Sequence, residues 1–110
     1  MTLKELLNDS INKFNKKVSS DAQLQKELIG IRKKVLIDLG SEKYNFSLEE
    51  NRISSVNDGE IADPDITVFS DPETFSGILS GRIKPMKAYA LRKIRIKGSL
   101  EDLMHLRKLF

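Results

Sequence analysis

The spacing of apolar residues changes at Gly30. Before it they recur at helical intervals: Leu3, Leu7, Ile11, Phe14 and Val18. After it they fall on alternate positions: Ile31, Val35, Ile37 and Leu39, with Arg32, Lys34, Leu36 and Asp38 on the opposite face. Because side chains alternate across a strand but share a face every three or four residues in a helix, the chain is expected to open with helices and to continue as a half-buried strand.

Start signals divide the helical part. Thr2 with Glu5 forms a capping box and predicts a helix to about Lys17. Ser20 with Gln23 has the same pattern and predicts a short second helix that ends at Gly30. After the first strand, alternation or turn residues predict further strands at residues 43–49 (KYNFSLE), around 52–56 (RISSV) and at 65–69 (DITVF).

The C-terminal half mixes short helices with one more strand. Ser70 or Asp71 is expected to cap a helix of about two turns, and Pro85 to start another. Residues 93–98 (KIRIKG) alternate as a strand, and Ser99 with Asp102 predicts a last helix. Five strands in an order that gathers helices at both ends predict an α+β fold rather than a βαβ repeat.

Length and composition narrow the possibilities. At 110 residues the chain is expected to form a single domain, residues 1–110. It has no cysteine, and no apolar run approaches the roughly 20 residues that span a bilayer. The N-terminus does not resemble a signal peptide, so we expect an intracellular, cytoplasmic protein.

Charge is unevenly placed. Residues 49–73 hold eight acidic side chains and one basic, whereas residues 81–98 (GRIKPMKAYALRKIRIKG) hold seven basic and none acidic. This basic stretch contains one aromatic residue, Tyr89, and no phosphate-loop pattern, so nucleic acid is not expected as a partner. Arg95 and Lys97 are expected to form the outward face of the last strand.

Catalytic and metal sites are not indicated. The chain has one histidine, His105, and the acidic run DGEIADPD lacks the spacing of a calcium loop. No nucleophile-elbow pattern accompanies the histidine, so we predict no enzyme activity, no catalytic residue and no metal or cofactor.

Apolar residues of the C-terminal half form a set that serves either as plain core or as the wall of a pocket. Short helices with Gly or Pro at each joint favour a pocket because they pack less completely than long ones and can separate. The set contains Phe75, Ile78, Leu79, Met86, Tyr89, Leu100, Leu103, Met104, Leu106 and Phe110.

The order of these features from Ala62 to Leu106, ADPDITVFSDPETFSGILSGRIKPMKAYALRKIRIKGSLEDLMHL, resembles the sterol carrier protein 2 family. The FSGILSG helix, the G-x-[IL]-x-P-x-x-A-[YF] motif, the basic K-[IL]-x-[IL]-x-G strand and the final L-x-x-L-M-x-L helix carry the likeness. One position departs: the family commonly has Gly before the lysine of the last strand, where this chain has Arg92. This departure concerns the local backbone and the edge of the pocket.

The resemblance implies a five-stranded, mainly antiparallel sheet covered on one face by about five helices, with a hydrophobic tunnel between them. It also implies binding and transfer of fatty acids, acyl-CoA, sterols or phospholipids. The tunnel would be lined by the apolar set without Phe110, with Met86, Ala88 and Tyr89 facing inward. Outer bases would contact head groups or, transiently, a membrane surface: Arg82, Lys84, Lys87 and Arg92. The alternative is an interaction or accessory module with a collapsed pocket that serves a partner enzyme or protein.

Overall fold

The computed structural model describes residues 2–99. Helices α1 (Leu3–Ser20) and α2 (Ala22–Leu28) open the chain. Five strands follow: β1 (Lys33–Asp38), β2 (Lys43–Glu49), β3 (Arg52–Ile53), β4 (Asn57–Asp58) and β5 (Ile66–Phe69). The described part ends with α3 (Pro72–Leu79), α4 (Pro85–Ala90) and β6 (Arg95–Lys97). The helix expected at the C-terminus lies outside the described residues.

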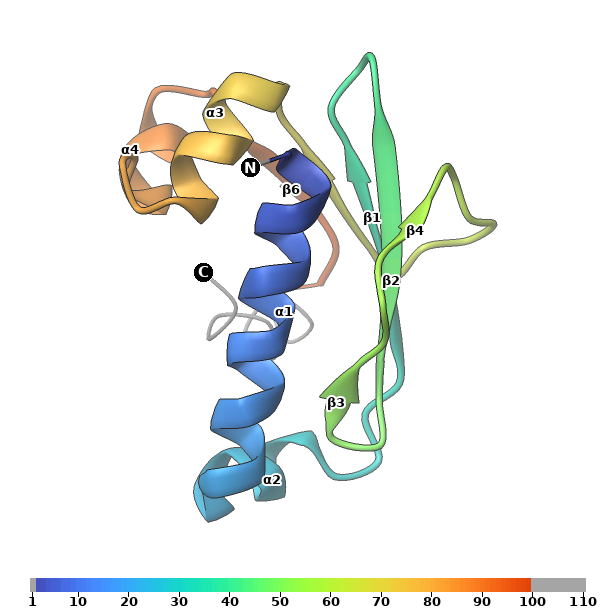
Figure 1. Ribbon diagram of the computed structural model, residues 1–110. Coiled ribbons are helices and arrows are strands. Elements are labelled where there is room, and N and C mark those ends of the chain that lie inside the picture. The colour runs from blue at the N-terminus through green and yellow to red at the C-terminus, as the bar shows by residue number, and fades with distance from the viewer. Residues whose placement is uncertain (1, 100–110) are drawn as a thin grey trace.

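The strands form one mixed sheet in the order β3-β2-β1-β5-β6, with β4 also paired to β2. β1 runs parallel to β5, and the other pairings are antiparallel. Helices α1 and α3 pack together on one face of this sheet (Figure 1). The predicted α+β class and the mainly antiparallel sheet with helices on one face are confirmed.

The third predicted strand is broken into two pieces. Both β3 and β4 pair with the same edge of β2, through Ile53 opposite Leu48 and Asp58 opposite Tyr44. Between the two pieces, the Ser54 N–H donates to the Ser47 carbonyl at 2.8 Å, and the Ser54 hydroxyl accepts from the Ser47 N–H at 2.9 Å. A side-chain oxygen thus replaces a backbone carbonyl in the ladder. The register also shifts by one residue between the Leu48–Ile53 pair and the Asn45–Asn57 pair, as at a β-bulge. Within the described residues, the sheet therefore has six strands instead of the predicted five.

Helix caps follow the prediction at two of three positions. Thr2 and Glu5 form the predicted capping box, and Asp71 caps α3 through the Thr74 N–H at 2.8 Å. This hydrogen bond is the main reason that the pKa of the Asp71 carboxyl lies below its ordinary value. The prediction that Ser20 caps α2 is wrong: α1 continues through Ser20, and Asp21 accepts from the Leu24 N–H at 3.1 Å.

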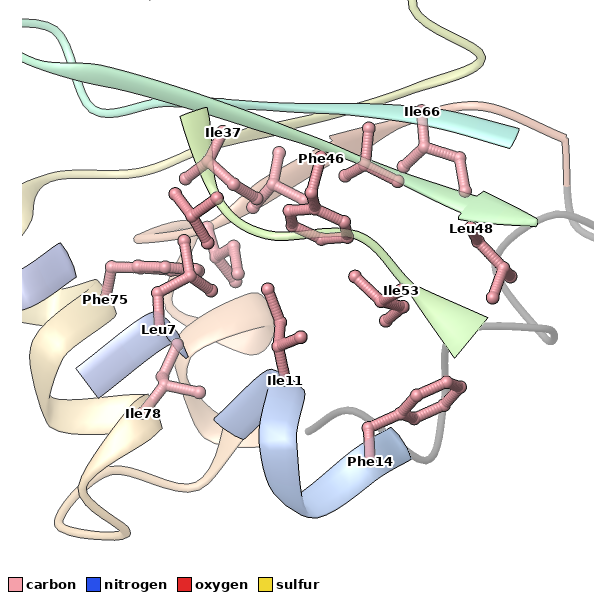
Figure 2. Packing of buried hydrophobic residues seen from close by; sticks show 14 of the residues in the cluster. Leu7, Ile11, Phe14, Ile37, Phe46, Leu48, Ile53, Ile66, Phe75 and Ile78 are labelled. Atoms are coloured by element: carbon pink, nitrogen blue, oxygen red, sulfur yellow. The ribbon is translucent and has the colours of Figure 1, made fainter. Parts of the chain in front are cut away.

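The core lies between α1, α3 and the sheet. Leu7, Ile11 and Phe14 of α1 are buried against strand residues that include Phe46 and Ile53 (Figure 2). These α1 positions are the ones that the helical spacing of the sequence selects. The same spacing extends to Val18, which is also buried. Burial of this face, rather than helix propensity, provides most of the stability of such a helix.

The opposite face of the sheet is also partly covered. Leu36, on the predicted solvent side of β1, is buried, together with its cross-strand neighbours Asn45 and Thr67. The connection between β4 and β5 runs over this face (Figure 1), and the Asn45 side chain donates to the Gly59 carbonyl at 2.9 Å. The expectation of a half-buried strand therefore fails at Leu36, because a long connection lies where solvent was expected.

Candidate ligand-binding site

Helix α4 is a short element fixed mainly at its C-terminal end. Pro85 occupies its first turn, where a missing N–H costs nothing. At the other end the Arg92 N–H donates to the Tyr89 carbonyl at 3.0 Å and the Lys93 N–H to the Ala88 carbonyl at 2.9 Å. These two bonds form a Schellman turn, which reverses the chain from α4 toward β6.

Arg92 adopts the left-handed backbone conformation, with φ of 59°. This is the position at which the resemblance leads one to expect Gly. The turn therefore keeps the shape that favours Gly, although the residue is Arg, at a cost of about 1–2 kcal/mol. The substitution leaves the path of the backbone as the Schellman turn requires and adds a guanidinium at the end of α4.

Most of α4 lies outside the core. Ala88 is buried, whereas Met86 is 83% exposed and Tyr89 is 63% exposed. In Figure 1, α4 occupies the edge of the helical layer farthest from β2 and β4. Met86 and Tyr89, expected to face a tunnel, thus lie on the outside among residues 2–99, and the small Ala88 takes the inward position.

A cavity of about 570 Å³, here named the β6 hollow, lies between α4 and β6. Ile94 and Ile96 supply its apolar side, with Ile94 buried and Ile96 still 37% exposed. Ile96 pairs with the buried Val68, which places it on the helix side of the sheet. The residues that line the hollow are Tyr89, Ala90, Arg92, Ile94, Arg95 and Ile96.

A second cavity of about 570 Å³, here named the basic hollow, lies along another side of α4. Its lining combines apolar with basic side chains: Arg82, Ile83, Lys84, Lys87, Ala88, Leu91 and Lys93. Ile83 connects this hollow to α3, because a Cβ atom placed on Gly77 would lie 2.5 Å from the Ile83 Cδ1 atom. The glycine inside the FSGILSG segment thus allows Ile83 to approach the helix.

The predicted site residues separate into three groups. Phe75 and Ile78 are buried in the closed core, and Leu79 packs against it. Met86 and Tyr89 are exposed on α4. Four others lie outside the described residues: Leu100, Leu103, Met104 and Leu106.

The predicted head-group residues all line the two hollows: Arg92 the β6 hollow, and Arg82, Lys84 and Lys87 the basic hollow. The sequence reasoning missed four large apolar lining positions as site residues: Ile83, Leu91, Ile94 and Ile96. The alternation of the KIRIKG strand did point Ile96 inward, and that signal could have identified it.

The acidic stretch has structural partners. Asp58 pairs with Lys4 at 3.0 Å, and Glu60 pairs with Lys43, which raises the pKa of that lysine. Asp65 accepts from the Lys34 N–H at 2.8 Å. Within residues 2–99, no group of three or more side chains is suited to hold a metal ion. His105 lies outside the described residues.

A third cavity, of about 400 Å³, lies where α1 meets the β2–β3 turn and is lined by polar residues. Glu50 and Asn51 have φ of 52° and 63°, as a two-residue hairpin of the I′ type requires. Asn15 of α1 bonds to the backbone of Ile53 beside this turn, so the arrangement here fastens an edge strand to a helix.

Comparison with known proteins decides the family. A model of the SCP-2 sterol transfer family matches residues 11–110. The chain belongs to this family. A search of curated proteins gave no significant match. Among residues 2–99, no helix of this SCP-2 family member is long and apolar enough to cross a bilayer.

Solved structures of several proteins share the fold. Sterol Carrier Protein 2 Like 2 from Aedes aegypti is 20% identical, with 96% of this chain and 97% of that chain covered and a TM-score of 0.59. The ubiquinone synthesis protein UbiJ-SCP2 is 12% identical, with 90% and 87% covered and a TM-score of 0.65. The sec-alkylsulfatase Pisa1 from Pseudomonas sp. is 13% identical over 78% of this chain, with a TM-score of 0.60, but this chain spans only 14% of the sulfatase.

Proposed function

We propose that this protein binds and transfers lipids without catalysing a reaction, and that the β6 hollow receives the apolar part of the lipid. The observation that carries the proposal is the partial exposure of Ile96 on a sheet face that is otherwise closed by the core. A volume of about 570 Å³ falls within the range of roughly 300–1,000 Å³ that small-molecule pockets occupy. Membership of a sterol transfer family supports the same reading.

The rim of the β6 hollow favours an anionic head group. Arg92 and Arg95 both line it, and guanidinium groups bind carboxylates and phosphates through paired, charge-assisted hydrogen bonds. Arg95 also lies over the Phe69 ring, with 5.3 Å from its Cζ atom to the ring centroid, which holds the guanidinium near β5. A fatty acid or a phospholipid fits this combination of charge and apolar surface. A solution structure of the Aedes aegypti relative, 22% identical with a TM-score of 0.55, is described as palmitated.

The free energy of burying a lipid tail favours reversible transfer of the lipid between membrane and protein. Burial of each methylene is worth about 0.8 kcal/mol, so a 16-carbon tail offers about 12 kcal/mol before the costs of association. A lipid that leaves a bilayer gains almost none of this, because the bilayer interior is as dry as the hollow. Exchange between membrane and protein is then nearly balanced and reversible.

Titration with a fluorescent fatty acid tests this proposal. Ile96→Arg should weaken binding more than tenfold, because it places a charge where the tail would lie. Ile29→Arg is the matched control, since Ile29 is also exposed but lies at the end of α2, away from α4 (Figure 1). Circular dichroism and urea unfolding establish that both variants are folded.

Two results would contradict lipid binding. One is the absence of binding by the unmodified protein across fatty acids, sterols and phospholipids. The other is equal affinity of the Ile96→Arg and Ile29→Arg variants, which would exclude the β6 hollow as the site. Mass spectrometry of the protein as purified adds an independent measurement, because a co-purified lipid identifies the ligand class.

A second candidate function is an accessory module that serves a partner enzyme or protein. The burial of Phe75 and Ile78 in a closed core favours it, because these positions were expected to line the tunnel. The similarity of fold to UbiJ-SCP2, a ubiquinone synthesis protein, is compatible with such a role. This alternative predicts no co-purified lipid and no response in the fatty-acid titration.

A further inference from the structure

Exposed apolar side chains concentrate on α4 and its C-terminal cap. Met86, Tyr89 and Leu91 are 83%, 63% and 57% exposed, and they lie within six consecutive residues. Of the exposed large hydrophobic residues in the described part of the chain, the others are Ile29 and Ile96, which lie on different elements. Clustered exposure of this kind is typical of a surface that contacts a partner or a membrane.

Basic side chains surround this apolar cluster. Residues 74–100 contain seven basic and no acidic residues, and Lys84 and Lys87 lie beside the exposed positions on the same element. Ion pairs among residues 2–99 involve lysines on other elements, such as Lys4, Lys13 and Lys43. No carboxylate of the described chain thus forms an ion pair with Lys84 or Lys87.

The combination of apolar anchors with a basic surround selects one class of partner. At an anionic bilayer, apolar side chains enter the boundary between head groups and acyl chains while lysines and arginines remain among the phosphates. Tyrosine is enriched at this depth. Nucleic acid would account for the bases, but it leaves Met86 and Leu91 without a role, and Tyr89 alone is a poor stacking platform.

We propose that α4 docks on the surface of an anionic bilayer, with Met86, Tyr89 and Leu91 as anchors and Lys84 and Lys87 among the head groups. This inference rests on the proposed lipid transfer and supplies its first step. Residues of α4 line both the β6 hollow and the basic hollow, so docking through this helix brings the openings of both to the source of lipid. Tyr89 belongs to the anchor set and to the lining of the β6 hollow at once.

Sedimentation with vesicles tests the docking surface. The unmodified protein should bind vesicles of phosphatidylcholine with phosphatidylglycerol, bind pure phosphatidylcholine far more weakly, and dissociate as salt rises. Lys84→Glu with Lys87→Glu should weaken binding more than tenfold, because each charge near such a surface contributes a factor of about five. Lys16→Glu with Lys17→Glu on α1 changes the net charge equally, at exposed positions away from α4, and should have a much smaller effect.

The anchors need a separate variant. Met86→Ser with Leu91→Ser keeps every charge and should weaken vesicle binding about tenfold. If the protein docked through charge alone, the affinity of this variant for vesicles would equal that of the unmodified protein. Both side chains are exposed, so the fold is expected to survive, and circular dichroism checks this.

Several outcomes would overturn the docking surface: equal losses in the α4 and α1 charge variants, undiminished binding by Lys84→Glu with Lys87→Glu, or no effect of the serine substitutions. Equal binding of single-stranded DNA or polyglutamate with the same dependence on Met86 and Leu91 would also overturn it in favour of a different partner. Fatty-acid titration of the unmodified protein without vesicles measures lipid binding independently of docking. Binding in one measurement and not in the other shows whether docking or lipid binding has failed.

Discussion

At the scale of single residues, Arg92 combines an unfavourable backbone conformation with a place at the β6 hollow. Residues held in the left-handed region cluster at functional sites, where the surrounding structure maintains them. Here the Schellman turn fixes the conformation, and the side chain lines the hollow. Arg92 thus both lowers the stability of the fold through its backbone conformation and supplies a positive charge at the rim of the β6 hollow.

Substitutions of Arg92 separate these two effects. Arg92→Gly should raise the free energy of unfolding by about 1 kcal/mol relative to Arg92→Ala, because Ala keeps the Cβ atom that disfavours φ of 59°. Both variants lack the guanidinium, so both should bind an anionic lipid about tenfold more weakly than the unmodified protein. Urea unfolding and fatty-acid titration measure the two quantities.

A difference in affinity between the Gly and Ala variants would show that Arg92 acts through the shape of the turn. Equal stability of the two variants would instead contradict the assignment of backbone strain. The departure from the family pattern at this position was visible in the sequence. Its conformation was not, because a left-handed Arg leaves no signature in the spacing of apolar residues.

At the scale of elements, the edge strand β3 is completed by a side chain. The Asn15 amide of α1 accepts from the Ile53 N–H at 2.7 Å and donates to the Ile53 carbonyl at 2.9 Å. One amide group therefore supplies both bonds that a neighbouring strand would otherwise make. This contact also attaches α1 to an edge that would offer unpaired backbone groups to other chains.

Removal of this amide should loosen the edge. Asn15→Ala leaves the buried backbone groups of Ile53 without their partner and should lower the free energy of unfolding by about 1–3 kcal/mol. Hydrogen exchange at the Ile53 amide should become faster. Asn12→Ala is the matched control on the exposed face of the same helix and should be neutral or slightly stabilising. Equal effects of the two substitutions would contradict the role of Asn15.

The sequence predicted long elements better than short ones. The α1 spacing of Leu7, Ile11 and Phe14 spans several turns and selected the buried face correctly. Helix α4 has six residues, too few for the spacing to decide which stripe faces inward, and the Schellman turn after it places Ala88 rather than Met86 on the core. The break in the third strand arises from the Ser54 hydroxyl, a contact that alternation of apolar residues does not report.

At the scale of the whole molecule, lipid binding and stability are linked. A ligand that binds the folded protein alone, at about one hundred times its dissociation constant, adds about 2.7 kcal/mol to the free energy of unfolding. For a domain of this size, that corresponds to a rise in Tm of about 10 °C. The Ile96→Arg variant should show a much smaller rise at the same lipid concentration, as thermal unfolding followed by circular dichroism can measure.

A rise of equal size in both proteins would mean that the lipid stabilises the fold from another site. A fall in Tm would mean that the lipid binds the unfolded chain instead. The position of the β6 hollow could not be predicted from the sequence, because it depends on how α4 meets the edge of the sheet. The family resemblance supplied the fold and the expectation of an apolar site, and the basic stretch supplied the rim.

The connection between β4 and β5, residues 59–65, lies on the face of the sheet turned away from the helices, and α4 lies at the opposite side of the molecule (Figure 1). This connection contains three acidic residues and no basic residue. The acidic connection and the basic α4 segment thereby lie on opposite sides of the protein. An electric field acts on such a separation as a torque before any contact is made. Near a negatively charged membrane the molecule would rotate while still in solution, so that it arrives with α4 foremost and the β4–β5 connection toward the water.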